Sequence, residues 1–235
     1  MINVYWACLE KEGLRAKDPS SILKEISKEK MSLGYPRCPA FIEHLDNVYG
    51  VPSIYNYKIK VDREKGEVYS EDYDQAFFSE HVLTEKRDMS IGFLSYIHRY
   101  VFFTDEPSLK ITITPSYLDD NSFNKNAILV PGTMDIGKYF RGTECAFQLR
   151  DGVDEVEFKE DENYMYIHFD TKEEINFKKF TYNPAISELG QRVLNSKEHR
   201  SGKHEKLFRP LKHWYRLFKS ENLKKQILTE IRKQF

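Results

Sequence analysis

The fold is decided most clearly by residues 145–169, which read CAFQLRDGVDEVEFKEDENYMYIHF. Three short runs make up this stretch: side chains alternate in the first two, as they do in strands that bury one face, and the third, at 164–169, is rich in aromatic residues. The Asp-Gly pair at 151–152 and the polar run at 160–163 separate these runs and are typical of turns. We therefore predict a meander of three antiparallel strands, at residues 144–150, 155–159 and 164–169.

Strand-like patterns continue upstream of this stretch. They predict strands at 2–9, 53–61, 67–70, 91–103 and 109–114. The last two flank a turn that contains Asp and Pro, which predicts the strongest hairpin of the chain. Short helices are expected after the Asp-Pro-Ser-Ser sequence at 18–21 and within 37–47. No strand precedes a helix long enough for a parallel crossover, so the expected fold is mainly β, an antiparallel sandwich or jelly-roll-like body.

The sequence pattern changes after Asn183 and Pro184. Apolar residues then recur at helical spacing as far as Leu194, residues 195–206 are polar, and Pro210 can open a second helix. Ser220 can cap a third, because Leu223, Ile227, Leu228 and Ile231 follow at helical spacing. We therefore divide the chain into a β-rich body, residues 1–183, and a helical C-terminal unit, residues 184–235.

The formal net charge of −1 conceals two oppositely charged parts. Residues 196–235 carry 12 Lys and Arg against 4 Glu, whereas residues 1–195 carry 24 basic against 33 acidic residues. A split of this kind predicts either a basic segment that binds an external anion or one that folds back onto its own acidic body.

Composition excludes several classes of protein. Hydrophobic residues make up 40% of the chain, with 16 Phe and 15 Tyr, which is incompatible with disorder throughout. We expect neither a membrane span nor a signal peptide, because no long apolar run occurs and the start lacks a basic segment. Three widely spaced cysteines argue against a disulfide framework or a structural zinc site, and we expect Cys38 and Cys145 to be buried and inert.

Catalytic motifs are scarce in this sequence. It contains no GxSxG elbow, no Walker loop and no GxGxxG sequence. Two HxD triplets occur, and an HxD can supply two ligands of the facial triad in Fe(II)/2-oxoglutarate oxygenases. The candidate metal pairs are therefore His44 with Asp46 and His168 with Asp170, and His81 or His98 could complete the first.

Two segments are candidates for binding. The first is the basic and aromatic run in the C-terminal unit, which could bind nucleic acid or an acidic protein face, or could pack on the body. Its candidate residues are Lys206, Arg209, Lys212, Trp214 and Arg216. The second is the glycine-containing loop at 130–142, where Arg141 could bind a carboxylate or phosphate or pair with Asp135.

Five short motifs resemble uncharacterised proteins of tailed phages, especially large phages of marine cyanobacteria, and are also similar to a bacterial family of unknown function with a compact β architecture. They are CPAF at 38–41, YGVPSIY at 49–55, FTDE at 103–106, PGTMDIGKYFR at 131–141 and YIHF at 166–169. The resemblance covers roughly residues 38–170. It implies a phage-encoded protein located in the host cytoplasm or the virion, and it assigns no catalytic residue.

These observations lead to two expectations about function. The first is a non-enzymatic phage protein, a virion component or a macromolecule-binding factor, that acts through its charge-split surface and needs no cofactor. Its partner would be a phage or host protein, with nucleic acid at the basic C-terminal unit and a second copy of the chain as alternatives. The second is a metal-dependent enzyme, oxygenase-like, with a His/Asp site inside the β body.

Overall fold

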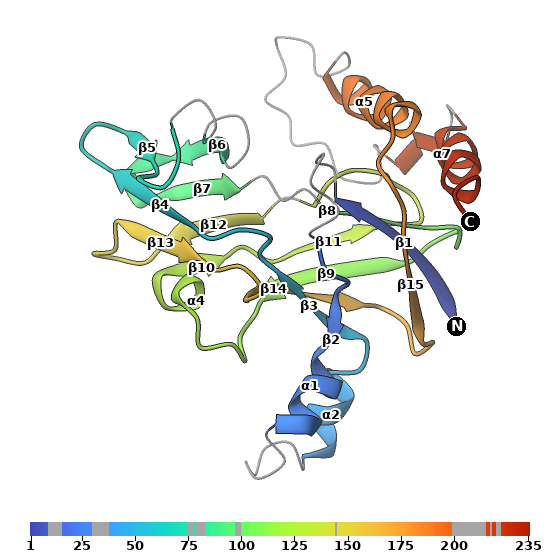
Figure 1. The fold of residues 1–235 in the computed structure, drawn as a ribbon, viewed down its shortest axis with the longest axis horizontal. Coiled ribbons are helices and arrows are strands. Elements are labelled where there is room, and N and C mark those ends of the chain that lie inside the picture. Colours follow the sequence, from blue (N-terminus) through green and yellow to red (C-terminus); the bar gives the residue numbers. More distant parts are fainter. Residues whose placement is uncertain are drawn as a thin grey trace.

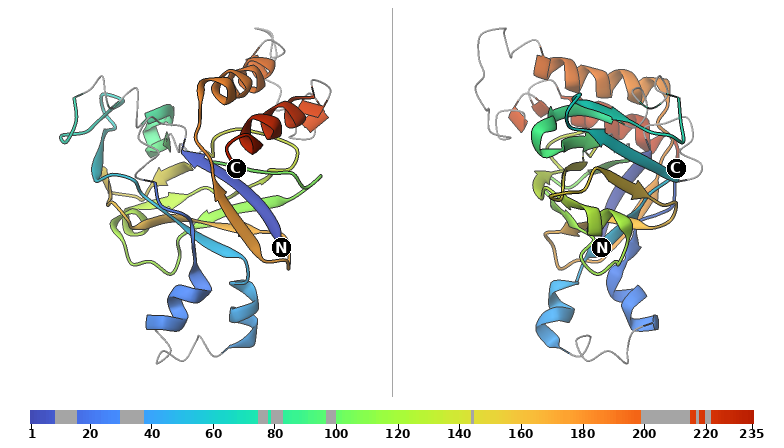
Figure 2. Two further views of the ribbon diagram at one scale, coloured as in Figure 1. Left: turned by 45° about the vertical axis from the view of Figure 1, so that its right-hand side comes forward. Right: turned by 90° about the vertical axis from the view of Figure 1, so that its left-hand side faces the viewer.

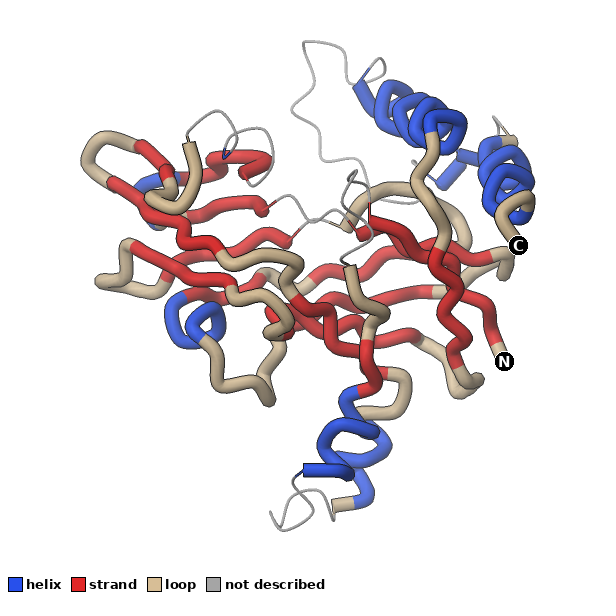
Figure 3. The backbone as a smooth tube through the Cα atoms, viewed as in Figure 1, coloured by secondary structure: helices blue, strands red, loops and turns tan. Residues whose placement is uncertain are grey.

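The computed structural model describes residues 1–8, 16–29, 38–74, 78, 83–96, 100–143, 145–198, 215–216, 218–219 and 222–235. Strands form the centre of the molecule, and the longer helices lie at two opposite ends (Figure 3). The fold is mainly β, with most strands paired antiparallel, as the sequence predicts.

Two sheets form one half of the β body (Figure 1). The five-stranded sheet has the order β11-β9-β14-β3-β2. Its strands are β2 (Ser20–Ser21), β3 (Val48–Pro52), β9 (Lys110–Pro115), β11 (Gly132–Asp135) and β14 (Asn163–Phe169). The first three-stranded sheet has the order β15-β1-β8, with β1 and β15 parallel. Its strands are β1 (Ile2–Cys8), β8 (Tyr100–Thr104) and β15 (Ile175–Lys179).

Two further sheets form the other half. The four-stranded sheet has the order β10-β12-β7-β6 and the second three-stranded sheet the order β13-β4-β5. The former contains β6 (Leu83–Asp88), β7 (Phe93–Tyr96), β10 (Ala127–Leu129) and β12 (Cys145–Leu149). The latter contains β4 (Tyr57–Asp62), β5 (Glu67–Tyr69) and β13 (Glu155–Phe158).

The helices attach to the outside of these sheets. They are α1 (Ile22–Glu29), α2 (Pro39–His44), α4 (Ser122–Asn126), α5 (Pro184–Glu198) and α7 (Leu223–Arg232), with one 3-10 turn at Met89–Ile91. Helix α5 begins as the sequence predicts, because Pro184 occupies its first turn and the Asn183 Oδ1 accepts the Ile186 N–H at 2.9 Å. Helices α1 and α2 lie at one end of the molecule and α5 and α7 at the other (Figure 2).

Aromatic side chains fill the space between the sheets. Tyr49, Phe169 and Phe177 contact one another edge to face and join the five-stranded sheet to β15. In the other half, Phe147 and Phe158 contact each other from strands of different sheets, 6.1 Å between ring centroids. The sheets are thus packed face to face around one apolar core, as in a sandwich.

Strand β1 is buried on both of its faces. Val4 and Trp6 point into the core between the sheets and are fully buried. Tyr5 and Ala7 point to the opposite side, where they belong to a second apolar cluster with residues of α5 and α7. Because successive side chains of a strand point to opposite faces, β1 carries a layer on each side. The molecule therefore has a helical layer over the outer face of the β15-β1-β8 sheet.

The strand positions predicted from the sequence are largely confirmed, and the strand predicted at 67–70 pairs with the one before it, since β4 and β5 form an antiparallel hairpin. Two other predicted pairings are wrong. The predicted hairpin does not form, since β8 pairs with β1 whereas β9 pairs with β11 and β14. The predicted meander does not form either, because β12, β13 and β14 belong to three different sheets. The predicted strand at 91–103 is two strands, β7 and β8, again in different sheets. The chain therefore passes from one sheet to another between each of these strands.

A first prediction concerns the helical layer. Replacing Ile227, which is fully buried between α7 and the sheet, by Ala should lower the free energy of unfolding by about 2–4 kcal/mol. Thr229→Ala, on the exposed side of the same helix, should change it by no more than about 0.5 kcal/mol. Urea unfolding followed by tryptophan fluorescence measures both. A separate early transition of α7 in the wild-type protein would show that this helix is not part of the cooperative core.

Candidate functional site

Asp135 is a buried carboxylate at the end of β11. Its side chain is 2% exposed and accepts hydrogen bonds from Ser108 Oγ at 2.6 Å and from the N–H groups of Leu109 and Gly137 at 3.1 Å each. Lys138 Nζ lies 2.7 Å from its Oδ2 and also donates to Ser108 Oγ at 2.8 Å. The carboxylate therefore ties the turn after β11 to the segment that leads into β9.

Hydrogen bonds to the Asp135 carboxylate determine its protonation state. Burial alone would raise the pKa of the Asp135 carboxyl, but donors from Lys138, Ser108 and Leu109 outweigh it and hold the pKa below its usual value. A carboxylate with this many donors is a fixed anchor. It is a poor general base, because its affinity for a proton is reduced.

The C-terminal unit docks beside this anchor. Tyr215 Oη accepts the Asp135 backbone N–H at 2.8 Å. Lys224 Nζ donates to the carbonyls of Glu106 and Gly137, and burial lowers the pKa of Lys224. In the next turns of α7, Arg232 Nη2 lies 2.9 Å from Asp105 Oδ2. Part of the basic segment thus folds back on the body, which is one of the two alternatives that the charge split left open.

The predicted site residues are only partly brought together. The groups around the Asp135 carboxylate are those of Ser108, Leu109, Gly137 and Lys138, whereas Arg141 Nε donates to the neighbouring Gly142 carbonyl at 3.3 Å. Arg216 is exposed. The remaining candidates, Lys206, Arg209, Lys212 and Trp214, lie outside the described residues.

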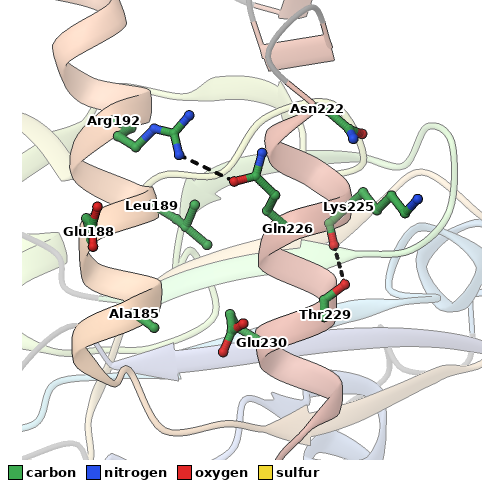
Figure 4. Close-up of a pocket in the computed structure, with 9 residues that line it drawn as sticks. All are labelled: Ala185, Glu188, Leu189, Arg192, Asn222, Lys225, Gln226, Thr229 and Glu230. Atoms are coloured by element: carbon green, nitrogen blue, oxygen red, sulfur yellow. Dashed lines mark hydrogen bonds between the residues drawn. The ribbon is translucent and has the colours of Figure 1, made fainter.

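A groove of about 500 Å³ lies between α5 and α7 (Figure 4). Glu188 and Arg192 line it from α5, and Lys225, Gln226 and Glu230 line it from α7. Arg192 Nη1 donates to Gln226 Oε1 at 3.3 Å across the groove. The lining is polar and carries both signs of charge, with Arg192 toward one end and Glu230 toward the other.

Helical spacing explains why these side chains share a groove. Residues 185, 188, 189 and 192 of α5 lie at i, i+3, i+4 and i+7, and residues 222, 225, 226 and 229 of α7 repeat this pattern. The sequence alone did not predict this groove, because a polar stripe beside the apolar positions is typical of any helix with one face on a protein body. That stripe was the available signal, although only the packing of α5 against α7 could turn two stripes into one groove.

The two HxD triplets meet in space, through their histidines. The rings of His44 and His168 are 6.3 Å apart between centroids, and Tyr117 lies 6.0 Å from His44. Asp46 and Asp170 are exposed. Within the part of the chain that the structure describes, no group of three or more His, Cys, Asp or Glu could hold a metal ion, and His81 and His98 lie outside it.

Cysteine chemistry differs from expectation at one position. Cys145 is buried as predicted, and burial raises the pKa of its thiol. Cys38, expected to be buried, is exposed at the N-cap of α2, a helix that buries none of its residues. All three cysteines are free.

Comparisons with known proteins give no family. A scan against protein-family models finds no match, and no curated protein matches the sequence. Among the described residues, none of the helices is both long enough and apolar enough to cross a membrane.

A second prediction concerns the buried carboxylate. Asp135→Asn should lower the free energy of unfolding by about 2 kcal/mol at pH 7, because it removes the charge that Lys138 and three other donors solvate. Since folding lowers the pKa of this carboxyl, the stabilisation is present above its unfolded pKa of about 4 and is lost at lower pH. The difference between wild type and variant should therefore narrow from pH 7 to pH 3.

Urea unfolding at the two pH values measures this difference. The matched control is Asp161→Asn, because Asp161 pairs with Lys17 at an exposed position and should contribute less than about 1 kcal/mol. A gap between wild type and Asp135→Asn that is the same at pH 3 and pH 7 would contradict the assignment of Asp135 as a charged anchor.

Proposed function

We propose that this chain is a non-enzymatic, phage-encoded binding protein whose α5–α7 groove binds a polypeptide segment of a phage or host protein. The observation that carries the proposal is the mixed charge of the groove on a helical unit that the body holds in place. The motif resemblance to tailed-phage proteins supports the phage origin, and the sequence supplies no catalytic motif that would favour an enzyme.

The distribution of charge favours a polypeptide over nucleic acid. Lys224 and Arg232 of α7 bind the body, and Lys233, the residue after α7, lies 2.6 Å from Glu230. The groove itself presents Arg192 and Lys225 together with Glu188 and Glu230. A polyanion is attracted by cations and repelled by carboxylates, so this lining suits a ligand that also carries both signs.

Side chains that can hydrogen-bond to a peptide backbone also favour a polypeptide ligand. Gln226, Asn222 and Thr229 line the groove, and amide and hydroxyl side chains both donate to and accept from a peptide backbone. Leu189 contributes apolar surface from the α5 side and is 9% exposed. A polar groove with a small apolar element can recognise a short extended segment through its backbone and its charges.

A third prediction tests this binding directly. A random peptide library is selected against the full chain, and the enriched peptides should carry acidic and basic residues together. The double reversal Arg192→Glu with Lys225→Glu should weaken their binding at least about tenfold, because it replaces attraction by repulsion at both cations. Lys172→Glu, exposed and in the β14–β15 turn, is the matched control and should leave the affinity unchanged.

Two results would contradict the proposal. One is selected peptides that bind the double reversal as well as the wild type. The other is retention on heparin that falls steeply with salt and disappears in the double reversal, which would assign the surface to a polyanion. Point variants are preferable to deletion of the C-terminal residues, because α7 contributes Leu223, Ile227 and Ile231 to the buried interior.

A further inference from the structure

We infer that His44 and His168 form a two-histidine site for a borderline transition-metal ion, Cu²⁺ or Zn²⁺. The two imidazoles belong to different HxD triplets and lie 124 residues apart in sequence, yet their ring centroids are 6.3 Å apart. This site is at the α1–α2 end of the molecule, away from the α5–α7 groove (Figures 1 and 2). The inference does not depend on the proposed peptide binding.

The fold brings the two histidines together by a simple route. Strand β14 pairs with β3 in a register that places His168 opposite Val48. Helix α2 ends at His44 and reaches β3 through a three-residue turn, so His44 lies next to the start of that strand. Asn47 holds the turn in place, because its backbone has φ of 54° and its Nδ2 donates to the carbonyls of Thr171 and Glu173 at 2.7 and 2.9 Å.

The separation of the rings suits a single ion. Metal–nitrogen distances of about 2.0–2.1 Å place the centroids of two imidazoles on one ion up to about 6.4 Å apart, and about 5 Å apart in a tetrahedral arrangement. The observed 6.3 Å is close to the upper limit, and the ring planes are at 68° to each other, so binding one ion in the tetrahedral arrangement requires each ring to turn a nitrogen toward the ion and the centroids to approach by about 1 Å. His44 is exposed, so its ring can make this movement without disturbing the core.

The surroundings determine the kind of site. Tyr117 packs against the His44 ring, 6.0 Å between centroids, and forms one wall of the site. The described residues hold no group of three or more ligating side chains, so the two imidazoles leave coordination positions open. Imidazole favours Zn²⁺, Cu²⁺ and Ni²⁺, and Cu²⁺ leads the affinity order for such donors. A site with open positions exchanges its ion and can accept a further ligand, unlike a closed structural site.

A double-mutant cycle tests the site. Cu²⁺ and, separately, Zn²⁺ are titrated into the full chain, His44→Ala, His168→Gln and the double variant, with glycine as a competitor to suppress weak binding. If one ion bridges both rings, each single variant should lose about tenfold or more in affinity at this site. The double variant should lose less than the sum of the two single losses, because either single substitution already breaks the chelate.

The chain has five other histidines, so a control for background binding is needed. His204→Ala is the matched control and should leave the affinity unchanged. Circular dichroism checks that His168→Gln is folded, and His44→Ala alters only an exposed side chain, so at least one arm remains informative. Unchanged affinity in both single variants, or losses that add in the double variant, would overturn the inference. Loss of peptide binding in the groove variants would leave it untouched.

Discussion

The burial of β1 on both of its faces is the constraint on which the rest of the structure depends. Trp6 and Val4 need the core between the sheets, whereas Tyr5 and Ala7 need cover on the opposite side. A strand that is apolar on both faces exposes a large apolar surface to water unless a second layer covers it. Helices α5 and α7 supply that layer. The groove between them therefore exists because the first strand of the chain requires a helical cover.

Complementary polar and charged groups determine the position of this helical layer on the sheet. Apolar packing is non-directional, so it places α7 over the sheet without determining its position along it. Arg232 on Asp105 and Lys224 on two carbonyls supply direction, and both contacts lie on the segments that the Asp135 carboxylate joins. Exposed ion pairs contribute little to stability. Here these contacts determine the position of α7 on the sheet. The positive charge of the C-terminal part is therefore paired in part with the negative charge of the body.

The sequence predicted where strands begin and end better than which strands pair. Alternation within β12 and β13 depends only on which face of each strand is buried, and that is a local property. Pairing depends on packing across the core, as between Phe147 and Phe158, and no local pattern records it. The hairpin expected around the Asp-Glu-Pro turn at 105–107 illustrates this. The turn is present, but it carries the chain from the β15-β1-β8 sheet to the five-stranded sheet.

The two HxD triplets show that prediction from local sequence has the same limit for a candidate site. Read singly, each triplet offers a His and an Asp two residues apart, and in a strand such residues point to the same face. In the fold, the carboxylates are exposed and the histidines of the two triplets become neighbours. Their proximity follows from the β3–β14 register and from the short turn at Asn47, a residue that tolerates the left-handed conformation. A shift of that register by one residue would turn His168 to the other face of the sheet, so the site depends on the pairing of two strands rather than on either motif.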